Sequence, residues 1–361
     1  MTVKRTIELF VYWLTGVALG TAAFAPASLA EAPQSHSALV ISALEKHILP
    51  RVAAVEIAAG PLAGDVKRVC ENGDDASREE LSGHFRQAVE AWAGVDFLRF
   101  GPMLDAGLRE KISFWPDPRG ILARQLRQFL VSSDVTAVEG GAIAKQSAAL
   151  QGLPALEVLL TDKDAPLAPG SASAFRCAFA LAIAENVAAL THRLHDAWSK
   201  ASGWKDKMLR TGSDNDTYKD SQESAAEIVK ALLVGFQLIG DVQVKPRLEA
   251  ATTLAGPFEK ANLSKAYYAS SVASLQALYD TVALEDYLPE DKDWVKNWAG
   301  GAWRVIQASD GAGGRSASAA KDEAPVLRVL FDRITGLRKL IVGEMSPAAG
   351  LTVGFNELDG D

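Results

Sequence analysis

The amino-acid sequence predicts an all-α protein made of two helical bundles joined by a linker. Two observations support this fold class. Apolar residues recur at intervals of three and four along nearly the whole chain, which is the spacing of one helix face. No stretch alternates apolar and polar residues between hairpin turns, as antiparallel strands would. With 361 residues, 48% hydrophobic and 23% charged, the chain is long enough for more than one core.

The first thirty residues, 1–30, have the pattern of a secretory signal peptide. Lys4 and Arg5 precede an apolar run, and Ser28-Leu29-Ala30 supplies small residues for cleavage near Ala30. An uncleaved membrane anchor is the alternative, but the small-residue site favours cleavage. No later stretch approaches the ~20 apolar residues that span a bilayer. We therefore expect a periplasmic or secreted protein that meets the membrane only through this segment, before cleavage.

Residues 31–203 are expected to form the first bundle. Its helices are interrupted at Pro50, and Ser77 with Glu80 forms the S-x-x-E pattern of a helix start. The order breaks again at Phe100-Gly101-Pro102 and at residues 114–118, where two prolines and two aromatic residues predict a rigid, packed loop.

Two shorter helices and a long one should follow in this bundle. The first runs from Ile121 to Leu130, and Asp134 can cap a second that continues to Gly152. The long amphipathic helix begins near Phe175 and ends near Trp198.

The second half repeats the helical pattern after a charged linker at residues 204–220. Residues 221–361 form the second bundle, with apolar stripes near 225–239, 268–282 and 326–341. Residues 309–320 are a low-complexity Gly/Ala/Ser linker, and the chain ends in the tail G-F-N-E-L-D-G-D.

Charge and cysteine content exclude several classes of function. The formal net charge is -8, so no basic surface for nucleic acid is indicated. The two cysteines, Cys70 and Cys177, most simply form one disulfide in an oxidising compartment, and two buried free thiols are the alternative. The chain has no G-x-S-x-G, no phosphate-binding glycine loop, no C-x-x-C and no H-E-x-x-H.

One stretch, residues 151–160, concentrates the candidate chemistry. A helix stops at Gly152, resumes through Pro154, and places Glu157 among leucines. A buried carboxylate must find a partner, a proton or a metal, because an unpaired buried charge is very costly. The alternative is a structural glutamate at a helix start, where the helix dipole favours negative charge.

We predict a ligand-binding cleft where this helix breaks, because helix ends free backbone groups for contacts. The turns at Phe100-Gly101-Pro102 and 115–117 should border it. Asp117 could instead cap the helix that follows it, and Arg99 could form an ion pair inside the fold. The expected cleft residues are Gly152, Pro154, Glu157, Arg99, Trp115 and Asp117.

Metal ligands are harder to identify. Glu157 is one candidate, and it is also the candidate catalytic residue if the protein is an enzyme. His192 and His195 are three apart, with Glu185 on the same helix face, and form a weaker candidate site. The alternative is a solvated last turn, where imidazoles suit the negative end of the helix dipole.

Several of these segments together resemble the imelysin-like proteins, which are exported helical proteins of bacteria. The matching features are spread over nearly the whole mature chain: Phe100-Gly101-Pro102, Phe114-Trp115-Pro116-Asp117, residues 152–160 and the tail from Gly354 to Asp361. The resemblance implies a two-domain, all-helical fold. It also implies a motif, G-x-H-x-x-E, that is proposed to bind metal.

The chain departs from that motif at one position. Gly152 and Glu157 match, but the histidine is replaced by Pro154, which has no ligand atom. The family includes proteins with a claimed peptidase activity and proteins tied to iron acquisition.

We therefore expect a non-catalytic periplasmic binding or accessory protein, with a metallopeptidase and an envelope interaction module as alternatives. A divalent metal or iron is the candidate cofactor, although the motif's histidine is missing. The expected partner is a small ligand, a metal or an envelope protein.

Overall fold

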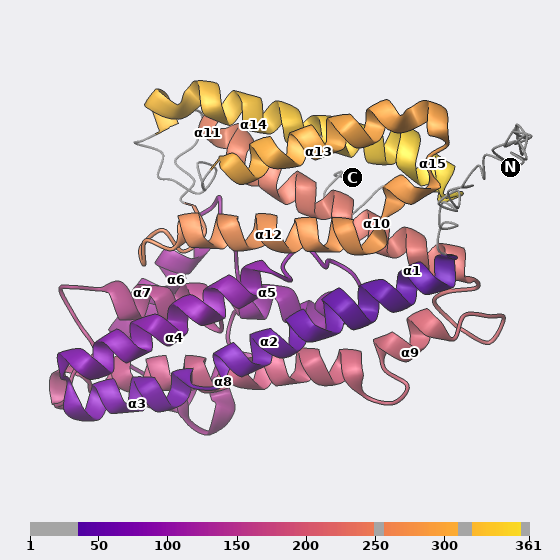
Figure 1. Cartoon of the computed structure of the whole chain (residues 1–361). Helices are drawn as coiled ribbons and strands as arrows, with labels where there is room; N and C mark the ends of the chain where they lie inside the picture. Colours follow the sequence, from indigo (N-terminus) through magenta and orange to yellow (C-terminus); the bar gives the residue numbers. More distant parts are fainter. Residues whose placement is uncertain (1–34, 249–255, 310–319, 355–361) are drawn as a thin grey trace, which may run out of the picture. The chain divides into compact units, whose positions relative to one another are not determined.

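The computed structural model describes residues 35–248, 256–309 and 320–354 (Figure 1). Within these ranges every regular element is helical and no strand occurs, which confirms the all-α class. The predicted signal peptide and most of the C-terminal tail lie outside the described residues. The α-helices are α1 His36–Ala43, α2 Leu49–Ala59, α3 Leu62–Asn72, α4 Asp75–Ala93, α5 Leu108–Ile112, α6 Ile121–Ser132, α7 Leu153–Thr161, α8 Ala174–Ser199, α9 Trp204–Leu209, α10 Ser221–Gln237, α11 Lys245–Leu248, α12 Ser264–Val282, α13 Asp293–Ala308, α14 Ala320–Leu340 and α15 Ser346–Ala348.

Three pairs of helices are continuous through a π-helical turn. These turns are Leu44–Ile48, Leu238–Val244 and Ile341–Met345. The first lies just before Pro50, which stands in the opening turn of α2. A proline there removes a backbone donor, and a wider turn accommodates the loss without ending the helix.

Helix α4 begins earlier than its sequence pattern predicts. Asp74 is the N-cap, and its side chain accepts a hydrogen bond of 2.7 Å from the backbone N–H of Ser77. Ser77 is itself buried inside the helix. The S-x-x-E cap proposed for Ser77 and Glu80 is therefore wrong, because the aspartate three residues upstream already satisfies that donor.

The segment between α6 and α7 is not the predicted helix. Asp134 caps only the short 3₁₀ turn Val135–Ala137, and further 3₁₀ turns lead to Leu150. Gly140 and Gly141 have φ values of 60° and 78°. Two successive left-handed residues cannot continue a right-handed helix.

The helices form two packed groups, and contacts of α1 and α4 connect them (Figure 1). Helices α2, α3, α4 and α8 pack together, as do α10, α12, α13 and α14. Helix α1 packs on α10 and α12, and α4 also packs on α12. Residues from Pro33 onward group as one compact unit, so the boundary between two bundles stays a prediction.

The predicted linker at 204–220 starts with a helix, α9. Met208 of α9 is buried, and Trp204 packs against Gly101, where an added Cβ would lie 3.0 Å from the indole. Part of this segment is therefore tied to the body of the protein.

Cys70 of α3 and Cys177 of α8 form the predicted disulfide. Their Cα atoms are 5.9 Å apart. The bridge joins two helices that also pack along their lengths.

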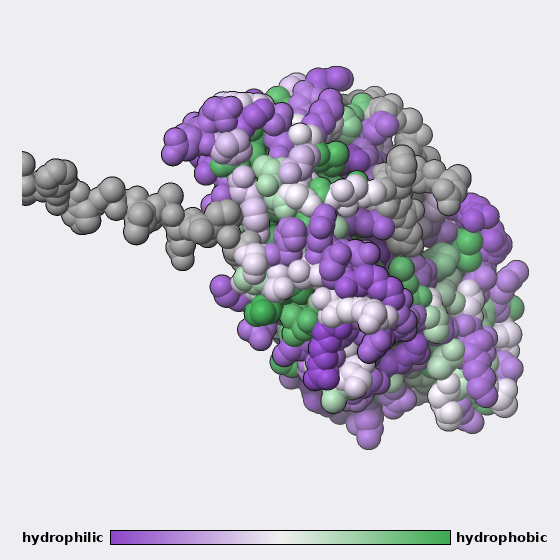
Figure 2. Space-filling model, turned by 90° about the vertical axis from the view of Figure 1, so that its right-hand side faces the viewer, coloured by the Kyte–Doolittle hydropathy of each residue, from purple (hydrophilic) through white to green (hydrophobic). Residues whose placement is uncertain are grey.

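The expectation that no segment after the signal peptide is apolar enough to span a bilayer is wrong for the segment that contains α8. Among the described residues, Ser171–Leu209 is long and apolar enough to span a bilayer by length and composition, and 50% of its most apolar window is buried inside the protein. A long core helix passes the same test. The protein face in Figure 2 is largely hydrophilic, with hydrophobic residues in small separate patches.

Candidate functional site

Helix α7 begins at a glycine whose neighbours leave no room for a side chain. Gly152 is the N-cap, and a Cβ there would lie 2.2 Å from the carbonyl oxygen of Ile112 and 2.4 Å from that of Lys111. Pro154 stands in the first turn, where a missing backbone N–H costs little. The start of α7 is therefore held against the end of α5, and this contact fixes where Glu157 lies.

Glu157 is a buried acid, with 6% of the residue exposed. Its Oε1 accepts a hydrogen bond of 2.9 Å from the backbone N–H of Ala261. Burial raises the pKa of Glu157 to about 7, and the Ala261 N–H and the Lys260 ammonium offset only part of this effect. Near neutral pH the side chain is therefore divided between its protonated and ionised forms.

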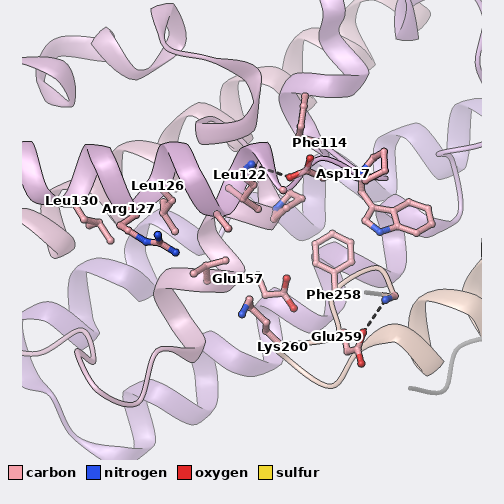
Figure 3. Close-up of a pocket in the computed structure, with 17 residues that line it drawn as sticks. Phe114, Asp117, Leu122, Leu126, Arg127, Leu130, Glu157, Phe258, Glu259 and Lys260 are labelled. Carbon is pink, nitrogen blue, oxygen red and sulfur yellow. Dashed lines mark hydrogen bonds between the residues drawn. The ribbon is translucent and has the colours of Figure 1, made fainter. Parts of the chain in front are cut away.

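A cavity of about 750 Å³ opens beside Glu157 (Figure 3). Its walls come from the turn 114–120 with α6, from α7, and from residues 256–260. Cavities of this size with mostly apolar walls are typical of small-molecule sites. The apolar lining is Phe114, Trp115, Pro118, Leu122, Ala123, Leu126, Leu130, Pro154, Val158 and Phe258.

Four charged side chains other than Glu157 also line the cavity. Asp117 is committed to capping α6, because its two oxygens accept hydrogen bonds of 2.9 Å from the N–H groups of Ile121 and Leu122. Glu259 accepts a hydrogen bond of 2.8 Å from the N–H of Gly256.

The other two charged groups are cations. Arg127 extends from α6 toward the centre of the cavity, and the Lys260 ammonium lies beside Glu157 (Figure 3). No carboxylate in the described part of the chain forms an ion pair with Arg127 or Lys260.

A buried ionic network lies behind the cavity wall. The Nε of Arg109 is 2.9 Å from Oδ1 of Asp96, and the hydroxyl of Tyr267 donates to Oδ2 at 2.7 Å. Arg109 also donates to the carbonyl oxygen of Trp115 at 3.0 Å. Burial alone would raise the pKa of Asp96, but the charges of Arg109 and Arg99 hold it below its usual value. The network thereby fixes the backbone that carries Trp115.

The structure brings together most of the predicted cleft. Trp115, Asp117, Pro154 and Glu157 all line the cavity. Gly152 does not, because it packs against α5, and Arg99 acts on Asp96 inside the fold. The predicted border at Phe100-Gly101-Pro102 is also wrong, because that turn packs against α9.

Two contributions to the lining, Arg127 and residues 256–260, were not predicted from the sequence. Arg127 is marked only by lying one helical turn from Leu130 on the same face. Residues 256–260 carry no local signal that they would meet α7.

The candidate histidines His192 and His195 bind a glutamate from another helix. Their Nδ1 atoms contact the two carboxylate oxygens of Glu56, on α2, and the His192 contact is 2.7 Å. The predicted partner, Glu185, instead lines a groove between α3 and α8. These histidines therefore cross-link α2 and α8 and are not part of the cavity lining.

The remaining histidines are also held away from the cavity by their own partners. The Nε2 atom of His47 lies 3.3 Å from the hydroxyl oxygen of Ser274. The Nε2 atom of His36 lies 2.7 Å from the carbonyl oxygen of Ala349. His84 lies 2.7 Å from Asp65.

One group in the described part of the chain, Asp65, Glu80 and His84, has the spacing for a shared ion. Arg68 forms ion pairs with the carboxylates of both Asp65 and Glu80, so a side-chain cation already occupies the position that an ion would take.

The cavity residues do not fit a metal ion held by the G-x-H-x-x-E scheme. Pro154 offers no donor atom, and both oxygens of Asp117 are engaged by backbone N–H groups. The nearby Lys260 and Arg127 carry positive charge and would repel a cation. Glu157 alone cannot supply the three or four ligands that zinc requires.

Comparisons with known proteins agree with this architecture. The family model for imelysin peptidases matches residues 48–297. The structure of an imelysin-like protein from Psychrobacter arcticum is 20% identical, with a TM-score of 0.73, covering 89% of this chain and 97% of that one. A protein described as an iron-regulated protein A precursor, from Parabacteroides distasonis, is 12% identical, with a TM-score of 0.64, covering 90% and 96%. Likeness at these identities shows the fold alone. No curated protein matches the chain.

Proposed function

Because the chain belongs to the imelysin family, we propose that it is an exported, non-catalytic binding protein that holds a small organic ligand beside Glu157. The observation that carries this proposal is the cavity of about 750 Å³. Its walls are mostly apolar, and a few polar side chains converge near one buried acid, as in many small-molecule sites. This cavity favours a ligand-binding role over a purely structural module of the envelope.

The donor chemistry supports binding over peptide hydrolysis. A zinc peptidase needs about three protein ligands, an open position for water and a general base. Around Glu157 the motif's histidine is Pro154, and the five histidines of the chain have partners elsewhere or no place in the lining. A metallopeptidase built on Glu157 is therefore the less favoured function.

We place this protein as an accessory factor in metal or iron acquisition. One protein with the same fold is described as iron-regulated, and that description supports the assignment. Export is supported by the signal pattern before Ala30 and by the disulfide, which is typical of oxidising compartments. The predicted cleavage can be checked by the mass of the protein recovered from the periplasm.

Ligand binding can be tested with phenylnaphthylamine, a neutral apolar fluorophore. The mature protein should bind it saturably, with one probe per chain. Ala123→Trp places a bulky ring in the cavity from α6 and should abolish binding. Val131→Trp, on the same helix but 80% exposed and outside the lining, is the matched control. Equal binding by both variants would refute a ligand site in this cavity.

The proposal that the protein does not hydrolyse peptides is tested separately. Casein hydrolysis by the mature protein with added Zn²⁺ should not exceed that of Glu157→Gln. Zinc-dependent hydrolysis that is lost in this variant would establish the peptidase alternative instead.

A further inference from the structure

The two cations of the cavity come from different walls and extend into the same space. Arg127 extends from α6 toward the centre of the cavity, and Lys260, from the segment before α12, has its ammonium beside Glu157 (Figure 3). Both side chains are largely exposed to the cavity or solvent, so no burial cost prevents them from meeting an incoming group.

The position of the charges in the cavity, rather than their sum, favours an anion, because two carboxylates and two cations line it besides Glu157. Asp117 and Glu259 are already hydrogen-bonded to backbone N–H groups. Both keep their negative charge, but the groups left to contact a ligand are Arg127, Lys260 and the carboxyl group of Glu157, whose Oε1 accepts the Ala261 N–H bond. When Glu157 is protonated, these three side chains present two positive charges and one O–H donor.

From this arrangement we propose that the ligand is an apolar aromatic molecule with one carboxylate group, bound by Arg127 and Lys260 beside protonated Glu157. This inference rests on the proposed function. The guanidinium group matches a carboxylate with two parallel N–H donors, and the ammonium adds a point charge. The rings of Phe114, Trp115 and Phe258 supply the wall for the aromatic body.

The same geometry couples binding to a proton. An ionised Glu157 would repel the carboxylate of the ligand, so binding takes up a proton when Glu157 is ionised in the free protein. The charged groups that line the cavity around this position are Lys260 and Glu259, from the segment before α12, Arg127, from α6, and Asp117, from the turn before α6. Since the pKa of Glu157 is about 7, affinity should fall as pH rises from about 6 to about 8.5.

The test compares naphthoate with naphthamide, its neutral isostere, on the mature protein. At about pH 6, naphthoate should bind at least about tenfold more tightly than naphthamide. Arg127→Gln and Lys260→Gln should each remove about tenfold of the naphthoate affinity and leave naphthamide unchanged. Arg124→Gln, on the same helix and outside the lining, is the matched control. Glu157→Gln should bind naphthoate with no dependence on pH over this range.

The outcomes separate this inference from the proposed function. If phenylnaphthylamine binds but naphthoate and naphthamide bind equally, or not at all, the anion inference is overturned and the binding function stands. Loss of naphthoate affinity that is as large in Arg124→Gln as in Arg127→Gln also overturns it. If none of the three probes binds, the proposed function itself fails.

Discussion

Replacing Glu157 by glutamine is expected to change how the free energy of unfolding depends on pH. Burial raises the pKa of Glu157 from 4.5 to about 7 in the folded protein, whereas the unfolded chain exposes an ordinary glutamate. Between these values the folded state keeps a proton that the unfolded state has lost. The stabilisation is therefore fully present below about pH 4.5 and is lost as pH rises through about 7. Each tenfold difference in proton affinity is worth about 1.4 kcal/mol, so the loss amounts to about 3 kcal/mol.

Chemical denaturation at about pH 4.5 and about pH 8 measures this effect. A glutamine can still accept the Ala261 N–H bond through its amide oxygen, and it does not titrate. The two proteins should therefore be equally stable at the lower pH, and Glu157→Gln should be more stable by about 3 kcal/mol at the higher pH. Other titrating groups cancel in the difference. A difference that is the same at both pH values would refute the conclusion that Glu157 is buried mainly in its neutral form.

Further substitutions test the packing around the site, each by chemical denaturation beside the wild type. Cys70→Ser with Cys177→Ser should lower the free energy of unfolding by about 4.7 kcal/mol, because the disulfide spans 107 residues; a loss below about 1 kcal/mol would contradict the chain-entropy argument. Gly152→Ala puts a Cβ 2.2 Å from a backbone oxygen and should lower the free energy of unfolding by roughly 1–3 kcal/mol. Gly83→Ala, in open space within α4, is the matched control and should leave the free energy of unfolding unchanged or raise it. Arg109→Met removes the ion pair of the buried Asp96 carboxylate and leaves it the charge of Arg99 and the Tyr267 hydrogen bond, so it should lower the free energy of unfolding by roughly 3 kcal/mol. Wild-type stability would show that the ion pair is dispensable.

The spacing of apolar residues was enough to predict most helices. In α8 the predicted stripe is buried except at Phe175, which is half-buried; its members are Phe175, Phe179, Ile183, Val187, Leu190, Leu194 and Trp198. This succeeds because a helix repeats every 3.6 residues, so residues three or four apart must share a face. The prediction depends on local geometry alone and needs no knowledge of the partner helices.

Local patterns failed where a second residue competed for the same role. Asp74 takes the capping position that the S-x-x-E pattern assigned to Ser77. Between α6 and α7, the apolar spacing suggested a helix, but Gly140 and Gly141 adopt left-handed φ angles. Glycine permits these angles at little cost, so spacing alone cannot decide whether a helix continues through them.

Only those parts of the site that coincide with local breaks in the helical pattern were predicted from the sequence. Glycine and proline marked the start of α7, and the proline-rich turn marked Trp115 and Asp117. Glu157 meets its hydrogen-bond partner 104 residues further along the chain, in a segment without distinctive composition. That contact is set by how the segment before α12 packs against α7, which no local pattern specifies.

The replacement of histidine by Pro154 changes what the position of Glu157 can do. In the motif G-x-H-x-x-E an imidazole and a carboxylate would share one cation. In this chain the proline contributes an apolar surface to the cavity, and the charges beside the carboxyl group are the side-chain cations Lys260 and Arg127. Side-chain cations cannot leave the site when a ligand enters, so beside Glu157 they disfavour a metal ion and are able to bind an anionic group. The proline at residue 154 therefore accompanies a site in which the groups that face a ligand include two cations, as the proposed binding of a carboxylate requires.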